Sequence, residues 1–316
     1  MTIDTSSIEP GRTETPLAEI RFLFLPGRDL FGRRAERLRH LAKGHALEGY
    51  LAFLALLADA QQNTLNLLPA VPLPGAGEQA HCREHGMPLL DARTLPRDPA
   101  WRSALAMILR QMGESPLPAA ARETVAGLHR TAEADLERMA DQLLKGKPDD
   151  IPPRELPFIA AALQVYWVHM ASSMGEQAFG RLERGGVCPV CGSHPVAGIV
   201  RSGGPEHGLR YLSCALCAAQ WHMVRIKCSN CESTQGIDYF KQEGSNGAVK
   251  AESCDNCGAY LKLLYLEKDT RMEAMADDLA TIAIDMIMEK EGKARVGLNL
   301  YFHAGSEAKG EAQNPC

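Results

Sequence analysis

Cys188-Pro-Val-Cys191 is the first of four Cys-x-x-Cys pairs in the chain, and it is followed by Cys214-Ala-Leu-Cys217, Cys228-Ser-Asn-Cys231 and Cys254-Asp-Asn-Cys257. Twenty-two residues separate the first pair from the second, and the same number separates the third from the fourth. Each pair can present two sulfurs from one tight turn, and two such turns complete a tetrahedral set of four thiolates. The repeat therefore predicts a duplicated four-cysteine metal module.

The spacing predicts one metal ion per set of four ligands, and the two sets are Cys188, Cys191, Cys214, Cys217 and Cys228, Cys231, Cys254, Cys257. Four thiolates accept either zinc or a single iron, so the sequence leaves the metal open. With all eight sulfurs committed, we expect no free coordination position for Lewis-acid catalysis. Disulfides are the alternative interpretation of the same cysteines. His194, His207 and His222 lie in the same region and could replace a ligand if the pairing differs.

Whole-chain properties favour an ordinary globular protein that works in the cytoplasm. The 316 residues are 45% hydrophobic and carry a formal net charge of -5, which gives no overall field for nucleic acid. The first ten residues lack a basic region followed by an apolar run, so they predict no secretory signal. In a reducing cytosol, cysteines bind metals more readily than they form structural disulfides.

Apolar periodicity and breaks divide the chain into six segments. Residues 1–17 and 303–316 are polar and predict disordered tails, and residues 18–186 predict an all-α domain. Its helices are expected within 31–68, 101–112, 119–145 and 156–170, with a long loop before residue 101. The last of these is not expected to span a bilayer, because its apolar run is interrupted by Gln164 and His169 and continues into charged residues. Residues 187–226 and 227–266 predict the two metal modules, and residues 267–302 a C-terminal helix and return. The predicted class is thus mixed and mainly α.

A nucleic-acid-binding ribbon is the main rival interpretation of the cysteine region. Between residues 187 and 266, seven Lys or Arg residues face six Asp or Glu residues, which leaves no stripe of positive charge for phosphates. Tyr211, Trp221, Tyr239, Phe240 and Tyr260 could stack on bases, but aromatic residues in a small ribbon more often form its core. We therefore expect no nucleic-acid partner.

Other polar clusters predict no further site. The segment His81-Cys82-Arg83-Glu84-His85 is expected to be a solvated loop, and His169 a core histidine. The arginines between Arg21 and Arg39 are expected to form a solvated helix face. Because no phosphate loop, nucleophile elbow or paired-carboxylate motif occurs, we do not predict an enzyme.

Several motifs together resemble those of the FdhE family. They are residues 21–26 (RFLFLP), 31–38 (FGRRAERL), 188–193 (CPVCGS), 210–214 (RYLSC), 221–228 (WHMVRIKC) and 276–280 (ADDLA). The likeness runs over nearly the whole chain. All eight cysteine positions of the family hold a cysteine here.

The resemblance implies a cytoplasmic accessory protein for the assembly of respiratory formate dehydrogenases. It implies a helical N-terminal region, two rubredoxin-like ribbons with iron at the Cys-x-x-Cys pairs, and contact with the dehydrogenase catalytic subunit. On this basis we hypothesise that the iron centres handle electrons for, or protect, the unfinished enzyme. The alternative is that zinc merely folds a docking surface. Self-association and the dehydrogenase that is served stay open.

Overall fold

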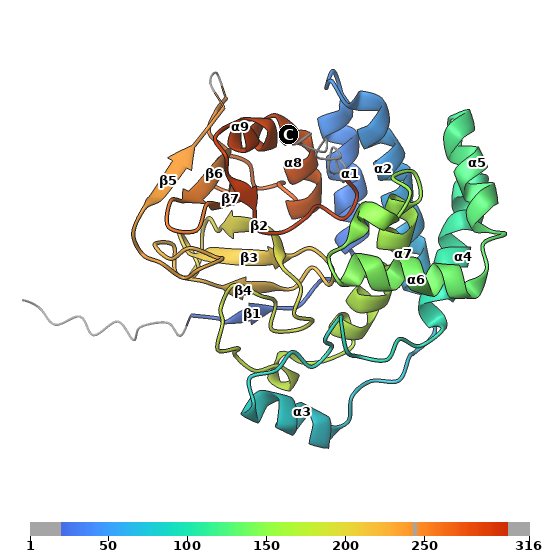
Figure 1. The fold of residues 1–316 in the computed structure, drawn as a ribbon, viewed down its shortest axis with the longest axis horizontal. Helices are drawn as coiled ribbons and strands as arrows, with labels where there is room; N and C mark the ends of the chain where they lie inside the picture. The colour runs from blue at the N-terminus through green and yellow to red at the C-terminus, as the bar shows by residue number, and fades with distance from the viewer. Residues whose placement is uncertain (1–19, 243–244, 303–316) are drawn as a thin grey trace, which may run out of the picture.

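The helices of the N-terminal half form one region of the molecule. The computed structural model describes residues 20–242 and 245–302, so both predicted tails, residues 1–17 and 303–316, lie outside the described residues. The helices are α1 (Leu30–Ala42), α2 (Glu48–Leu67), α3 (Ala76–Glu84), α4 (Ala100–Gly113), α5 (Ala119–Leu128), α6 (Glu133–Leu144) and α7 (Leu156–Ser172), with the 3-10 turns η1 (Pro148–Asp150) and η2 (Glu176–Ala178). We call residues 30–172 the helical region, and Figure 1 shows it on one side of the molecule with the sheet on the other.

Helix α7, which the sequence predicted as a helix within residues 156–170, is the central element of the helical region. Every residue from Leu156 to Ala171 is buried, and helices α2, α4 and α6 all pack against it. Even the polar side chains Gln164 and His169 are inside. In the described part of the chain, no helix combines the length and apolarity needed to cross a bilayer.

Two features of the helical region differ from the prediction. The helix expected over residues 119–145 is broken between α5 and α6, where the Thr131 hydroxyl donates to the Gly127 carbonyl and competes with helical hydrogen bonds. The polar stretch expected to be a loop contains α3, which begins where Glu78 accepts a hydrogen bond from the Gly75 N–H at 2.8 Å. Local hydrogen bonds of this kind end or begin a helix without changing its apolar pattern.

The cysteine region forms one mixed sheet rather than two separate ribbons. Its strands are β1 (Leu23–Phe24), β2 (Pro195–Val200), β3 (Arg210–Cys214), β4 (Gln220–His222), β5 (Ile237–Phe240), β6 (Val249–Cys254), β7 (Ala259–Tyr265) and β8 (Ala294–Arg295). The order is β1-β4-β3-β2-β7-β6-β5, and β8 pairs with β7. Strands β2–β4 form an antiparallel first ribbon and β5–β7 a second one. The two ribbons join through the parallel pairing of β2 with β7, with Gly198 opposite Leu263.

Strand β1 corrects the expectation that residues 18–186 are all-α. It leaves the helical region and pairs with β4, with Leu23 opposite Trp221. The two ribbons have the same strand order, so β4 in the first ribbon corresponds to β7 in the second. Strand β1 covers the outer edge of β4 in the same way as β2 covers the outer edge of β7. An uncovered edge would leave backbone groups unpaired. Two residues are too few to show a strand pattern, and the long-range pairing is what fixes this element.

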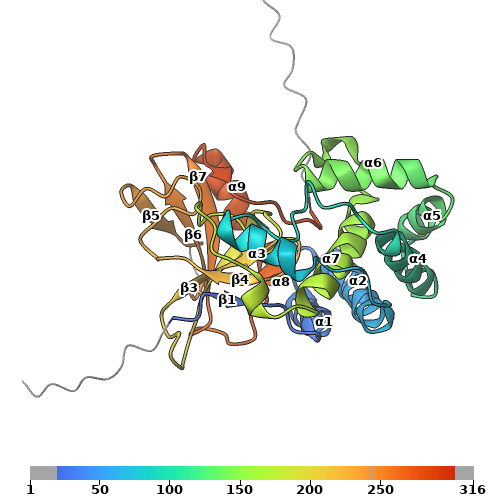
Figure 2. The same ribbon diagram turned by 90° about the horizontal axis from the view of Figure 1, so that it is seen from below.

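The C-terminal segment contains two helices where the sequence predicted one. Helix α8 (Ala274–Ala280) and helix α9 (Ile282–Lys290) are separated at Thr281, whose hydroxyl donates to the Asp277 carbonyl at 2.8 Å. The buried ammonium of Lys262 on β7 donates hydrogen bonds to the carbonyls of Asp278 and Thr281. Side chains therefore replace the hydrogen bonds that a continuous helix would need. Figures 1 and 2 show α8 between the sheet and α1, which it contacts.

Candidate metal centres

The first four-cysteine group lies where the first ribbon meets the helical region. Cys188 and Cys191 precede β2, and Cys214 ends β3 directly opposite Pro195, so strand pairing brings both turns together. The Sγ atoms of Cys191 and Cys214 are 3.3 Å apart, and those of Cys188 and Cys217 are 3.6 Å apart. All four sulfurs lie within 4.8 Å of one another. We call this group the first centre.

The second four-cysteine group repeats this arrangement in the second ribbon. Pairing of β5 with β6 places Ile237 opposite Cys254 and brings the third and fourth turns together. The Cys228 and Cys257 sulfurs are 3.8 Å apart, and the Cys231 and Cys254 sulfurs are 3.7 Å apart. We call this group the second centre. Metal–sulfur bonds of about 2.3 Å in a tetrahedron separate the sulfurs by about 3.8 Å, so both groups could hold a metal ion.

The backbone adopts one conformation after all four Cys-x-x-Cys turns. The residues that follow the second cysteine are Gly192, Ala218, Glu232 and Gly258, and their φ angles are 72°, 57°, 63° and 69°. Ala218 and Glu232 are the two non-glycine residues with positive φ in the described chain. Two of the four turns thus lack a glycine at this position. They nevertheless take the same left-handed conformation, which is uncommon for residues with a Cβ atom.

Contacts from the helical region hold both turns of the first centre. The Leu90 N–H donates to the Val190 carbonyl at 2.9 Å, and the Ala92 N–H donates to the Cys191 carbonyl at 3.0 Å. From α7, the Gln164 amide donates to the Ala215 carbonyl at 2.7 Å. These three bonds join the turns to segments far away in the sequence. The first centre is therefore part of the interface between helices and sheet.

Burial distinguishes the two centres. All four cysteines of the first centre are at most 1% exposed. In the second centre Cys228 and Cys254 are buried, but Cys231 and Cys257 are partly exposed. The second centre therefore lies at the surface of the sheet, and the first lies inside the protein.

The thiol pKa values show why these groups suit a cation. Burial raises the pKa of Cys188 and Cys217. Burial also opposes ionisation of Cys191, but hydrogen bonds from the neighbouring thiols lower the pKa of Cys191 below its usual range. In the second centre, burial raises the pKa of Cys228 to about 12, whereas the Asn256 amide lowers that of Cys231 to about 6. Sulfurs held this close share protons, and a metal ion that binds them displaces those protons.

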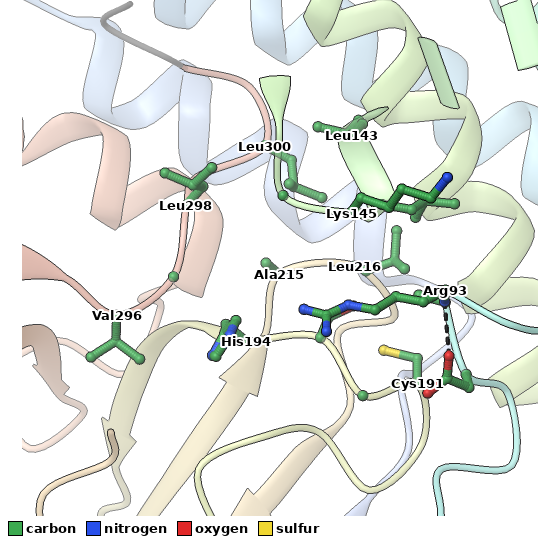
Figure 3. A pocket seen from close by; sticks show the side chains of 17 residues that line it. Arg93, Leu143, Lys145, Cys191, His194, Ala215, Leu216, Val296, Leu298 and Leu300 are labelled. Carbon is green, nitrogen blue, oxygen red and sulfur yellow. Dashed lines mark hydrogen bonds between the residues drawn. The ribbon is translucent and has the colours of Figure 1, made fainter. Parts of the chain in front are cut away.

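A cavity of about 420 Å³ opens beside the first centre. Figure 3 shows Arg93 and Lys145 reaching it from the helical side, His194 and Cys191 from the first ribbon, and Leu298 from the C-terminal return. It is therefore lined by all three parts of the chain. Its lining combines apolar side chains such as Leu298 with the basic side chains of Arg93 and Lys145.

The histidines do not join either sulfur group. Among the described residues, the clusters able to hold a metal are the two sets of four cysteines. His207 accepts a hydrogen bond from the Gly203 N–H at 3.1 Å, and the His222 ring contacts that of Tyr211. His81 on α3 and His85, which follows the end of this helix, contact each other. His169 is in the core, where burial lowers its pKa.

Aromatic residues of the ribbons are mostly core residues, as the sequence indicated. Tyr211, Trp221 and Tyr260 are at most 4% exposed, whereas Tyr239 is 46% exposed. The buried rings pack inside the sheet and present no face to a base.

Two arginines expected on a solvated face are buried instead. Arg34 is 1% exposed and donates to Glu273 at 3.0 Å, and Arg37 is 7% exposed and donates to Asp277 at 2.9 Å. Their partners come from the C-terminal segment near α8. Arg34 and Arg37 are one helical turn apart on the face of α1 that also carries buried Phe31 and Leu38, and that spacing was the available signal.

Family comparisons cover the chain in three parts. Residues 20–183 match the model "FdhE, N-terminal", residues 187–225 match "FdhE, central domain" and residues 226–302 match "FdhE, C-terminal domain".

Individual relatives agree over nearly the full length. The chain is 43% identical over 298 residues to "Protein FdhE homolog" from Edwardsiella ictaluri, with 92% of this chain and 94% of the relative covered. It is 40% identical over 302 residues to "Protein FdhE" from Salmonella typhimurium, with 94% and 96% covered. The crystal structure of the FdhE protein from Pseudomonas aeruginosa superposes with a TM-score of 0.83 at 40% identity, covering 90% of this chain and 100% of that one. The chain therefore belongs to the FdhE family.

Proposed function

We propose that this protein is a cytoplasmic accessory factor for the maturation of respiratory formate dehydrogenase and that it binds the catalytic subunit of that enzyme. Family membership over the whole chain supports this proposal. The two sulfur groups that could hold metal ions are the observation that carries its chemistry. The role is that of a maturation factor rather than an enzyme.

We assign one iron ion to each centre, with all eight cysteines of the Cys-x-x-Cys pairs as ligands. The sulfur separations of 3.3 to 3.8 Å support four-coordinate binding of a thiophilic ion. Bound iron would supply one-electron chemistry. The protein itself fixes the four sulfurs, excludes water from the first centre and holds its two turns against the helical region. Such a centre suits a redox or protective role toward an unfinished enzyme.

We also propose the domain division drawn from the sequence. The helical domain would cover residues 18–186, the two metal modules residues 187–226 and 227–266, and the C-terminal segment residues 267–302. The abrupt change from helices to strands after Ser172 supports the first boundary. The two modules would share one sheet, because β2 of the first pairs with β7 of the second.

An anaerobic affinity co-purification from cells that express formate dehydrogenase tests the partner. The wild type should retain the catalytic subunit, and the variant Cys188→Ser, Cys191→Ser should lose it together with metal from the first centre. Cys82→Ser is the matched control, because Cys82 lies on α3 outside both centres. If folded, metal-loaded wild type retains no catalytic subunit, the proposed partner is wrong.

Redox-inert zinc in a docking protein is the second candidate. The hydrogen bonds that embed the first centre between helices and sheet favour it, because they give a metal there a structural task. Zinc-loaded and iron-loaded protein can be compared for restoring dehydrogenase activity to cells that lack the factor. Full activity with zinc would favour docking, and activity only with iron would favour electron handling.

A further inference from the structure

We propose that the two centres have different tasks: the second centre is the one that gains and loses an electron, and Asn230 and Asn256 are the positioning residues that tune it. The first centre then has the lower reduction potential and holds the fold together. The inference rests on the proposed iron binding, but it does not depend on which protein is the partner.

Two asparagines cross-link the turns of the second centre. Asn230, between Cys228 and Cys231, donates its side-chain amide to the Cys257 sulfur at 3.5 Å. Asn256, between Cys254 and Cys257, donates its amide to the Cys231 sulfur, also at 3.5 Å. Each turn therefore donates to the last cysteine of the other turn.

The first centre has no equivalent amides, because the same positions hold Val190 and Leu216. These side chains are 0% and 2% exposed. Within the described residues, the N–H donors to the first-centre sulfurs are the backbone groups of Leu216 and Cys217, both 3.4 Å from Cys214. The Cys-x-x-Cys spacing is the same in both centres, so the difference lies in the third residue of each turn.

Charge and solvent add to the contrast. Lys293 donates a hydrogen bond to Asp255 at 2.5 Å, next to Cys254, and this bond raises the pKa of the Lys293 ammonium. Cys231 and Cys257 are partly exposed, whereas every first-centre cysteine is buried. Ionic strength and pH would therefore be felt more strongly at the second centre.

All of these differences would make the reduction potential of the second centre higher than that of the first. The four cysteines of each centre would hold the iron, and one-electron reduction of that iron would add one negative charge to the set of thiolates without breaking a bond. Amide donors and water would stabilise that extra charge, so they would raise the potential. A buried apolar shell disfavours the extra charge and lowers the potential. The second centre is therefore reduced first.

A redox titration of the iron-loaded full-length protein with dithionite, followed by visible absorption, tests this inference. We expect two one-electron steps. The double variant Asn230→Val, Asn256→Leu copies the residues of the first centre and should lower only the higher step. A tenfold loss in the preference for ferrous over ferric iron corresponds to about 59 mV.

The double variant Asn63→Val, Asn66→Leu on the exposed side of α2 is the matched control and should move neither step. If the double variant at the second centre loses iron, the single variants Asn230→Ala and Asn256→Ala are titrated instead. An unchanged higher step, a shift of the lower step alone, or a protein that takes up zinc but not iron would overturn the inference. Failure to bind formate dehydrogenase would leave it standing.

Discussion

Gln164 is the residue that couples the helical region to the first centre. Its amide nitrogen donates to the Ala215 carbonyl in the second Cys-x-x-Cys turn. Its amide oxygen accepts from Arg34 at 3.0 Å and from the Tyr301 hydroxyl at 2.6 Å. All of these groups are buried, so each depends on the others for its hydrogen bonds.

Gln164→Leu should therefore weaken both the fold and the first centre. The change leaves buried partners unsatisfied, which we expect to cost about 3 kcal/mol in the free energy of unfolding. It also frees the Ala215 carbonyl, so the first centre should release zinc to a chelator faster. Urea unfolding and a chelator assay on zinc-loaded protein measure the two effects.

Gln61→Leu separates these effects. Gln61 bonds to Tyr301, to the Ala161 carbonyl and to the Gln164 amide oxygen at 3.3 Å, but to neither turn, so the variant keeps the bond from Gln164 to the Ala215 carbonyl. It should lower the free energy of unfolding without changing the rate of zinc release. Equal acceleration in both variants would show that Gln164 acts through general stability alone.

At the residue scale, the sequence predicted the features that depend on local spacing. It did not predict the features that depend on partners far away in the sequence. The eight cysteines could be grouped because each pair is local and the interval repeats. The environment of Arg34 could not be predicted, because its partner Glu273 lies more than 200 positions away in the sequence. Likewise, the left-handed backbone at Ala218 and Glu232 could not be predicted, because alanine and glutamate rarely adopt it.

The joint between the two ribbons is the element that the duplicated sequence does not reveal. Gly198 on β2 lies opposite Leu263 on β7. A Cβ atom on Gly198 would come within 2.5 Å of the Leu263 side chain, which is only 1% exposed and has little room to move. The close approach of the two strands therefore depends on this glycine.

Gly198→Ala should lower the free energy of unfolding by about 1 to 3 kcal/mol through overpacking. Gly49→Ala on α2 is the matched control, because a Cβ atom there meets nothing within 4 Å. The control should keep or slightly raise stability, since alanine favours a helix over glycine. Thermal and urea unfolding compare the two, and equal stability would mean that the sheet adjusts at this joint.

Element existence was easier to predict than element ends. Helices α1, α2, α4 and α7 follow from apolar periodicity, which is a property of the segment itself. The breaks at Thr131 and Thr281 depend on single hydroxyl groups that bond the preceding turn. Strand β1 depends on the free edge of β4, which no local pattern describes.

For the whole molecule, the sequence predicted helices and a duplicated cysteine module but not how they are joined. The first centre touches the helical region through segment 90–92 and α7. The second centre lies in β5–β7, and β5 is the outermost strand of its sheet. The two centres therefore support different amounts of structure, although their ligand spacings are identical.

Metal loss should thus unfold the protein in two stages. Structural zinc contributes about 10 to 16 kcal/mol of apparent binding free energy, and a domain is stable by only about 5 to 15 kcal/mol. We expect Cys228→Ser, Cys231→Ser to raise amide exchange in β5 and β6 and to leave α7 protected. We expect Cys188→Ser, Cys191→Ser to raise exchange in β2 and β3. Exchange should also rise at residues 90–92 and in α7, because the turns that these segments contact lose their order.

Hydrogen–deuterium exchange with mass spectrometry on the zinc-loaded variants measures both patterns. If the two variants gave the same pattern, the sheet would be one cooperative unit, and the first centre would have no special role in joining it to the helices.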